Sequence, residues 1–333
     1  MSGDLRRDPL GGTWTVIAPG RLARPHDAGD AAGPACAPQA GAGPADSPAS
    51  CPFCEGHESQ TPPEVDAFRA PDTAPDTPGW RVRVVPNKFP VIAGGHEVIV
   101  HSPRHGVELA EQPLDELADV VRMYQRRIAA LCAGGAAAVT VILNQGGAAG
   151  ASLAHPHSQV LATPIVPPVL AAELDEFARY HDEHDGRCLL CDLVARTIAS
   201  PELLVFDGPI VAWAPDASRF PYELRLAPAA HEPDFAGAEA SAAAGALRRA
   251  LAALAVVTDR GPFNMWLHTA PCAGGRPFHW HLDVAPRLAT LAGFELGAGI
   301  GIDLVEPRDA AALLRDAVSK LDEPTGGSLD RRP

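Results

Sequence analysis

The chain has 333 residues, of which 46% are hydrophobic, so it is long enough for two domains or two similar halves with a full core. Its net charge of −14 argues against nucleic-acid binding, which depends on neutralising phosphates with Lys and Arg. No apolar run reaches the roughly 18 to 20 residues of a membrane span, and residues 1–8 lack the apolar segment of a secretory signal. We therefore expect a cytoplasmic protein without membrane contact.

Two segments of low complexity are expected to lie outside the packed core. Residues 27–50 consist almost entirely of Ala, Gly, Pro, Asp and Ser and predict a flexible loop. Residues 70–79 are a second weak segment, rich in Pro, Asp and Thr, and the tail at residues 322–333 is expected to fray.

The rest of the chain shows a mixed pattern of strands and helices. Short apolar and β-branched runs predict strands over residues 81–85, 97–101, 139–143, 159–162, 263–267 and 280–284. Apolar residues at helical spacing predict a helix over residues 113–132, which contains Leu114, Leu117, Val121, Tyr124, Ile128 and Leu131. A second helix is marked by Leu247, Leu251, Leu254 and Val257.

The second half of the chain repeats the landmarks of the first half in the same order. Each half contains a Cys-x-x-Cys pair, a strand ending near a histidine, a helix, another strand, a glycine-containing loop and a His-x-His pair. In the first half the landmark residues are Cys51, Cys54, His105, His155 and His157. In the second half they are Cys188, Cys191, His231, His279 and His281. We predict a tandem duplication of one α+β unit, with halves at residues 1–165 and 166–321.

The repeated Cys and His residues predict two zinc sites, because zinc prefers four such ligands in a tetrahedron. The first site would use Cys51, Cys54, His105 and His155, and the second would use Cys188, Cys191, His231 and His279. A rival set for the second ion, Glu173, His268 and His281 with His279, leaves the two cysteines of that half unexplained. A redox role for the Cys-x-x-Cys pairs is disfavoured, because their surroundings do not resemble a thioredoxin turn.

The three remaining cysteines are expected to be free thiols. The chain has seven cysteines, and an odd count without a secretory signal argues against a disulfide framework. Cys36, Cys132 and Cys272 are therefore interpreted as packing or bystander residues.

The run His155-Pro156-His157-Ser158-Gln159 is the candidate catalytic segment. Neutral histidine is a competent nucleophile toward phosphorus, and on an extended segment His155, His157 and Gln159 would share one face. With His155 held by zinc, His157 would be presented from a fixed backbone. Gln159, Ser152 and the N–H groups of the preceding glycine-rich loop could donate to phosphoryl oxygens. The alternative is that His157 is a buried structural histidine.

These segments resemble the galactose-1-phosphate uridylyltransferase branch of the histidine-triad superfamily. The similar segments are residues 7–10, 14–19, 51–54, 85–90, 96–100, 103–105 and 144–159, then His268 and residues 279–281 and 293–295. Hydrolases of this superfamily usually carry a third histidine where Gln159 stands, so Gln159 favours transfer over hydrolysis. The resemblance implies a tandem histidine-triad-like fold, with antiparallel sheets flanked by helices.

The resemblance also implies a ping-pong reaction in galactose metabolism. His157 would attack the α-phosphorus of UDP-glucose, and the nucleotidyl-histidine would then react with galactose 1-phosphate. Contacts to the nucleotide and its phosphates would come from Arg21, Arg24, Asn87, Phe89, Asn144, Gly150, Ser152 and Gln159. Glu295 would hold hexose hydroxyls. The partners would be nucleotide-sugar and sugar-phosphate substrates and a second copy in a homodimer.

The chain departs from the family pattern at three places. Ala289 stands where a sugar-side lysine is expected, and Gly301 stands where a glutamine is expected. The cysteine-containing second metal set looks like that of the related ADP-glucose phosphorylases, and iron in place of zinc stays open at that site. The alternatives are therefore a phosphorylase acting on ADP-glucose or a dinucleotide, and a non-catalytic zinc-stabilised nucleotide-binding protein.

Overall fold

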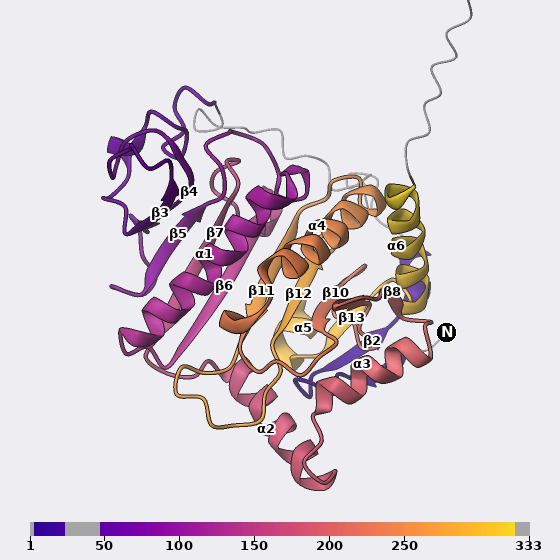
Figure 1. Ribbon diagram of the computed structural model, residues 1–333. Helices are drawn as coiled ribbons and strands as arrows, with labels where there is room; N and C mark the ends of the chain where they lie inside the picture. The colour runs from indigo at the N-terminus through magenta and orange to yellow at the C-terminus, as the bar shows by residue number, and fades with distance from the viewer. Residues whose placement is uncertain (1–2, 24–46, 324–333) are drawn as a thin grey trace, which may run out of the picture.

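The computed structural model describes residues 3–23 and 47–323. Their main feature is one long antiparallel sheet with helices on it (Figure 1). The first five strands of this sheet are β3 (Asp66–Arg69), β4 (Trp80–Pro86), β5 (His96–Val100), β6 (Ala138–Gln145) and β7 (His157–Thr163). The other five are β8 (Leu204–Phe206), β9 (Ile210–Trp213), β10 (Leu224–Pro228), β11 (Phe263–His268) and β12 (His281–Pro286).

The strand order shows the duplication directly. The sheet runs β3-β4-β5-β7-β6 and then β11-β12-β10-β9-β8, so the second half repeats the first in the opposite direction. The halves meet where β6 pairs with β11, with Asn144 opposite Asn264. The predicted α+β tandem fold is therefore confirmed, and the division at residue 165 stays a prediction because the two halves share one sheet.

Two helices cover one face of the sheet and form the main core. They are α1 (Leu114–Ala133) and α4 (Ala240–Val257), which pack against each other side by side (Figure 1). Their buried stripes meet apolar side chains of the sheet in one large cluster. Helix α6 (Pro307–Asp322) packs on α4 and β8.

Helix α4 bears on the expectation that no apolar run is long enough to span a membrane. By length and composition alone it is apolar enough to cross a membrane, with a mean hydropathy of 1.4 over 18 residues. In this fold it is a core helix, with Leu247, Leu251 and Leu254 buried against the sheet. Arg248 and Arg249 interrupt its apolar run, which is why the run does not stand out in the sequence.

A smaller core lies around α2 (Pro168–Glu183) and α3 (Leu189–Ala199). Phe177 of α2 contacts Phe278, with ring centroids 5.0 Å apart, and Trp213 of β9 is buried in the same cluster. The remaining short elements are the 3-10 turns η1 (Pro19–Ala23), η3 (Glu58–Gln60), η4 (Leu109–Glu111), η5 (Gly147–Ala149) and η6 (Phe235–Gly237), and helix α5 (Gly293–Ala298).

A three-stranded sheet ties the start of the chain to the second half. It consists of β1 (Asp4–Arg7), β2 (Trp14–Ile17) and β13 (Gly301–Asp303), with β13 parallel to β2. Behind it, the buried Arg225 donates to Asp283 at 2.6 Å and to Asp8 at 3.1 Å. Because an unpaired buried charge is costly, this ion triad fixes the N-terminal strands on β10 and β12.

The predicted strands and the two predicted helices all appear, with ends that shift by a few residues. The strands β1, β2, β3, β8, β9 and β13 and the helices α2, α3, α5 and α6 were not predicted. Helix α2 did carry a periodic signal, since Leu170, Leu174 and Phe177 recur at helical spacing and are buried. The strands β1 and β2 have four residues each, too few for a periodicity to be recognised.

Residues 70–79 and residues 47–50 are mostly exposed, so as far as they are described these two segments lie outside the packed core, as expected. Residues 70–79 form an ordered turn between β3 and β4, in which the Asp76 carboxylate accepts from Arg83 at 2.6 Å. Of the predicted flexible loop, only residues 47–50 are described, and they form a turn. Cys36 and most of the tail lie outside the described residues.

The expectation of free thiols at Cys132 and Cys272 is wrong, because these two residues form a disulfide. Cys132 lies near the end of α1, and Cys272 lies in the loop between β11 and β12. They are 140 residues apart in sequence, and the pairing of β6 with β11 brings them together. The bridge therefore joins the two halves covalently.

Replacing Asp303 with asparagine should stabilise the protein at neutral and alkaline pH. Burial and the nearby Glu223 and Glu306 carboxylates raise the pKa of Asp303 from 3.8 to about 7. The folded state thus binds this proton more tightly than the unfolded state, so stability falls as pH rises from about 4 to 7. Asp303→Asn keeps an acceptor for the Val305 N–H and removes the ionisation.

The expected gain in unfolding free energy is on the order of 2 to 4 kcal/mol at pH 8 and close to zero at pH 4. Urea unfolding of both proteins at the two pH values measures it. An equal effect of the substitution at pH 4 and pH 8 would contradict the proposed cause.

Candidate functional site

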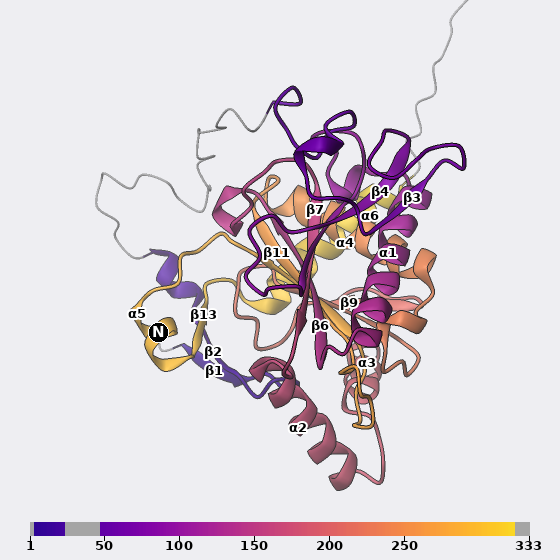
Figure 2. The ribbon, with the colours of Figure 1, turned by 90° about the vertical axis from the view of Figure 1, so that its left-hand side faces the viewer.

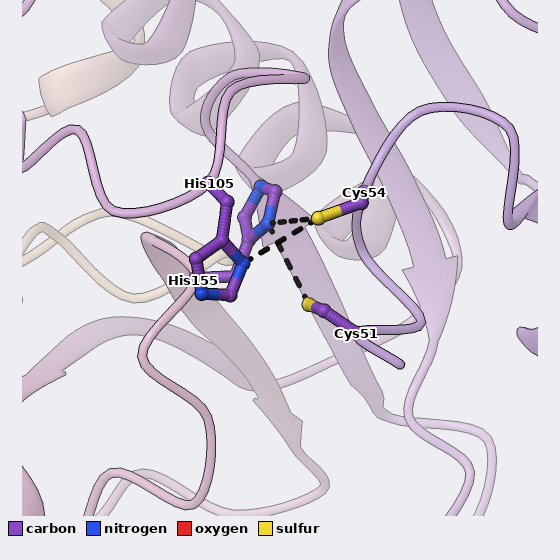
Figure 3. A group of neighbouring side chains, drawn as sticks. All are labelled: Cys51, Cys54, His105 and His155. Carbon is purple, nitrogen blue, oxygen red and sulfur yellow. Dashed lines mark hydrogen bonds between the residues drawn. The ribbon is translucent and has the colours of Figure 1, made fainter. Parts of the chain in front are cut away.

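The first predicted metal site is assembled from three separate segments of the first half (Figure 3). Cys51 and Cys54 lie on the turn before β3, His105 lies in the loop after β5, and His155 lies just before β7. The Cys54 sulfur is 3.4 Å from Nδ1 of His105 and 3.6 Å from Nδ1 of His155. The Cys51 sulfur is 3.6 Å from the same His155 nitrogen.

These separations fit a tetrahedral zinc site. Zinc bonds of ~2.3 Å to sulfur and ~2.0 Å to nitrogen place neighbouring ligand atoms roughly 3.5 Å apart in a tetrahedron. Burial and the adjacent Cys51 raise the pKa of Cys54 to about 11, so Cys54 would ionise at neutral pH only beside a cation. Burial lowers the pKa of His155 to about 4, which keeps its imidazole neutral as a ligand must be.

The second predicted site has the same arrangement in the second half. The Cys191 sulfur lies 3.4 Å from Nδ1 of His279 and 3.6 Å from Nδ1 of His231. The Cys188 sulfur lies 3.7 Å from the same nitrogen of His279. Burial and the Cys188 thiolate raise the pKa of Cys191 to about 12. Both tetrads could therefore hold a metal ion, and their donors suit zinc.

The rival ligand set is also brought together, as a separate group. Glu173 lies between His268 and His281, with its carboxylate oxygens 3.0 Å from Nδ1 of His268 and 3.6 Å from Nε2 of His281. His279, which the rival set also needs, turns its Nδ1 to the cysteines instead. The geometry thus keeps His279 in the cysteine tetrad.

The candidate nucleophile His157 begins β7 and is fixed by two hydrogen bonds in series. His155 Nε2–H donates to the Ser102 carbonyl at 2.7 Å, which leaves His155 Nδ1 facing the two sulfurs. His157 Nδ1–H then donates to the His155 carbonyl at 2.8 Å. This bond leaves Nε2 of His157 with a free lone pair, the form that attacks an electrophile.

The surroundings of His157 favour this neutral form. The residue is 8% exposed, and burial lowers the pKa of its imidazole, although the bond to the His155 carbonyl opposes this. The Phe53 ring lies against it, with centroids 5.2 Å apart. His157 is therefore held as an uncharged base in a largely desolvated position.

Two cavities meet at His157. One, of about 740 Å³, is lined by the side chains of Phe53, Asn87, Phe89, Val98 and Gln159 among others. The other, of about 420 Å³, is lined by the glycine-rich loop, including Asn144, Gly146, Gly147 and Ala151. His157 and Ser152 line both cavities, so a ligand spanning them would pass directly over the imidazole.

His96 is a buried residue of this site that the sequence did not single out. Its Nδ1 accepts from the Val91 N–H at 3.2 Å, which leaves the proton on Nε2. That Nε2 is 2.7 Å from the amide oxygen of Gln159 and 3.0 Å from the Asn87 amide nitrogen. Donation from His96 to the Gln159 oxygen leaves the Gln159 NH₂ group to act as a donor.

Asn264 is a second residue that the sequence did not indicate. Its amide donates to Asn144 and to the Ala149 carbonyl, both at 2.8 Å, so the second half braces the glycine-rich loop. Gly146 and Gly150 both have positive φ, and a Cβ on Gly146 would come within 2.9 Å of Pro262. Only glycine suits such a position without strain, so Gly146 lets the loop pack closely against Pro262.

Two residues implied by the resemblance, Arg21 and Glu295, do not line the cavities at His157. Glu295 lies on α5, beside β13 and the N-terminal strands (Figure 2), and its carboxylate accepts from the Ala292 N–H at 3.1 Å. Arg21 is exposed in η1, and neither Arg21 nor Glu295 lines the two cavities. Arg24 lies outside the described residues.

Comparison with known proteins places this geometry in a family. Residues 88–167 match the family described as galactose-1-phosphate uridyl transferase, N-terminal domain. The chain is 31% identical to the ADP-glucose phosphorylase of Arabidopsis thaliana, over 95% of this chain and 93% of that protein. It is 26% identical to the galactose-1-phosphate uridylyltransferase of Thermotoga maritima, over 94% and 98% of the two chains.

Solved structures of an ADP-glucose phosphorylase and a uridylyltransferase are also similar to this chain. The crystal structure of an ADP-glucose phosphorylase from Arabidopsis thaliana with bound ADP-glucose superposes with a TM-score of 0.80 at 30% identity, covering 95% of this chain and 99% of the other. A uridylyltransferase structure gives 0.70 at 28% identity, covering 97% and 100%. The similarity therefore extends over both halves, well beyond the catalytic segment.

Proposed function

The chain belongs to the galactose-1-phosphate uridylyltransferase family of the histidine-triad superfamily, and we propose that it transfers a nucleotidyl group through a covalent bond to His157. The observation that carries the proposal is the orientation of His157. Its Nδ1–H is committed to the His155 carbonyl, and the residue lines both cavities that meet at the site.

The chemistry has two balanced steps. The lone pair on His157 Nε2 attacks the α-phosphorus, an N–P bond forms, and the P–O bond to the leaving phosphate breaks. An acceptor phosphate oxygen then attacks the same phosphorus and the N–P bond breaks, which returns the lone pair to Nε2. The His155 carbonyl stabilises the positive charge on the imidazole during attack. Gln159, Ser152 and backbone N–H groups of the glycine-rich loop would donate to the phosphoryl oxygens.

Bound zinc would have a structural part in this mechanism. Cys51, Cys54, His105 and His155 would hold one ion, and Cys188, Cys191, His231 and His279 would hold the other. The first ion would fix the segment that presents His157, since His155 is both a ligand and the acceptor of the His157 hydrogen bond. Iron in the second site would use the same four residues.

For the donor we favour ADP-glucose, with inorganic phosphate as the acceptor. The similarity to an ADP-glucose phosphorylase is greater in both sequence and fold than that to the uridylyltransferases compared above. The second half also gathers Cys188 and Cys191 into a metal tetrad, the set that resembles ADP-glucose phosphorylases. Ala289 and Gly301 lack the polar side chains expected for a hexose-phosphate site.

A second candidate is transfer from UDP-glucose to galactose 1-phosphate. Residues 88–167 match the uridyl transferase family, and Glu295 is present to hold hexose hydroxyls. In a single chain Glu295 does not line the cavities at His157. This role therefore requires a second copy, in the homodimer that the resemblance implies, or a movement of α5.

Labelling of the protein separates these candidates. The chain should be incubated with ADP-glucose and, separately, with UDP-glucose, each carrying ³²P at the α-phosphate that is bound to the nucleoside. We expect acid-labile label on the protein from ADP-glucose, released faster by inorganic phosphate than by galactose 1-phosphate. Label from UDP-glucose alone, released by galactose 1-phosphate, would support the second candidate. No label from either donor, despite measurable nucleotide binding, would support a non-catalytic nucleotide-binding protein.

A further inference from the structure

Behind the nucleophile, three polar side chains form a closed group inside the apolar core. Side chains alternate along β7, so His157 and Gln159 face the cavity while Ser158 points to α1. The Ser158 hydroxyl is 2.8 Å from Nε2 of His101 and 2.6 Å from the hydroxyl of Tyr124. The Tyr124 hydroxyl is also 3.3 Å from the same His101 nitrogen.

Burying these three polar side chains in an apolar core is unfavourable in free energy. All three side chains are at most 2% exposed, and Tyr124 belongs to the main apolar cluster. Nδ1 of His101 has no hydrogen-bond partner among the described residues. Burial holds the pKa of His101 well below its usual value and raises the pKa of Tyr124, so both stay neutral. A buried polar atom without a hydrogen-bond partner is unfavourable, which indicates that the group has a role other than stability.

The duplicated half shows that the fold does not require these polar groups. Ser158 pairs with Ile99 and Leu143, and the corresponding strands pair Leu282 with Leu226 and Leu267. Leu282 therefore occupies the position of Ser158, and it packs in the same apolar cluster. Ile99 corresponds to Leu226, so His101, two residues further on, corresponds to Pro228. The half without the nucleophile thus builds this layer from apolar residues.

The polar group connects directly to the bonds that orient His157. The His101 N–H donates to the Pro156 carbonyl at 3.1 Å, and the neighbouring Ser102 carbonyl accepts from His155. The segment of His101 and Ser102 therefore holds the peptide that carries the His155 carbonyl. That carbonyl sets the tautomer of His157, so a shift of His101 would disturb the free lone pair on Nε2.

We propose that His101, Tyr124 and Ser158 are positioning residues that lock β7 against α1 and β5 and so hold His157 in line for attack. This inference rests on the proposed role of His157 as the nucleophile. Near-attack geometry is sensitive, and a displacement of about 1 Å can lower a rate by about 100-fold. None of the three side chains lines the two cavities, so they act through His157 and not on the substrate.

The test uses Ser158→Ala and Tyr124→Phe, which remove hydroxyls without adding bulk. We expect each variant to lower the rate constant of nucleotidyl-enzyme formation at saturating donor by about 10- to 100-fold. The dissociation constant for ADP, measured by calorimetry, should stay within about twofold. The matched control is Ser218→Ala, another buried serine that donates one hydrogen bond, at 2.7 Å to the Pro215 carbonyl. Ser158→Thr, which keeps a hydroxyl, should recover part of the rate.

Equal rates in the wild type, Ser158→Ala and Tyr124→Phe would overturn the proposal. The proposal would also be overturned if the loss of rate in each variant merely followed its loss of thermal stability, and if Ser218→Ala lost rate to the same extent. If the wild type forms no nucleotidyl-enzyme, the proposed function fails, and imidazole ¹⁵N NMR still tests the positioning. The His157 resonances, identified by their absence in His157→Ala, should report a single tautomer in the wild type and a mixture in Ser158→Ala. Unchanged resonances in that variant would refute the positioning role.

Discussion

Replacing His157 with alanine should abolish nucleotidyl-enzyme formation and turnover while the fold stays intact. Among the residues that the structure describes, the substitution removes the only imidazole that lines both cavities, and its Nδ1–H is committed to a backbone carbonyl. Because no other group can form the N–P bond there, we expect a loss of at least about 1,000-fold, as for removal of a nucleophile in other enzymes. Single-turnover assays with α-labelled ADP-glucose and UDP-glucose measure it.

The control is His181→Ala, which removes a partly exposed histidine from α2, and it should keep full activity. His157→Gly leaves space for a small base, so added imidazole should restore part of the transfer. Near-normal exchange by His157→Ala, with unchanged circular dichroism, would show that the covalent mechanism is wrong.

Replacing Cys51 or Cys54 with serine should remove one metal ion and strongly destabilise the protein. The wild type should contain close to two equivalents of zinc per chain, and each variant close to one. A structural zinc in small domains contributes on the order of 10 kcal/mol, so the loss here should reach several kcal/mol. Elemental analysis and urea unfolding of the same samples measure both quantities.

Cys191→Ser provides the comparison for the second site. It should also remove one equivalent, but the segment that carries His157 should keep its geometry, because the first tetrad is separate. Labelling of His157 should therefore suffer more from Cys51→Ser than from Cys191→Ser. Two equivalents of metal in the Cys51→Ser protein would contradict the first site, and iron instead of zinc would change only the identity of the ion.

The sequence by itself determined the repeated architecture and the chemistry of the central segment. The Cys-x-x-Cys and His-x-His pairs recur in one order, and this order predicted the duplication and both groups of four metal ligands before any fold was known. Local periodicity gave the two helices that cover the sheet, because each has to bury one continuous apolar stripe. Successive side chains of an extended strand point to opposite faces, and this local rule placed His157 and Gln159 on one face.

Only the tertiary structure decided which distant residues meet. The disulfide between Cys132 and Cys272, the bond from Asn264 to Asn144 and the group of His101, Tyr124 and Ser158 all depend on strand order and register. Local residue patterns carry no information on that order, because the energy of such contacts appears only after long chain segments have been brought together. For the same reason the sequence could name Glu295 but could not place it on α5, outside the two cavities that His157 lines.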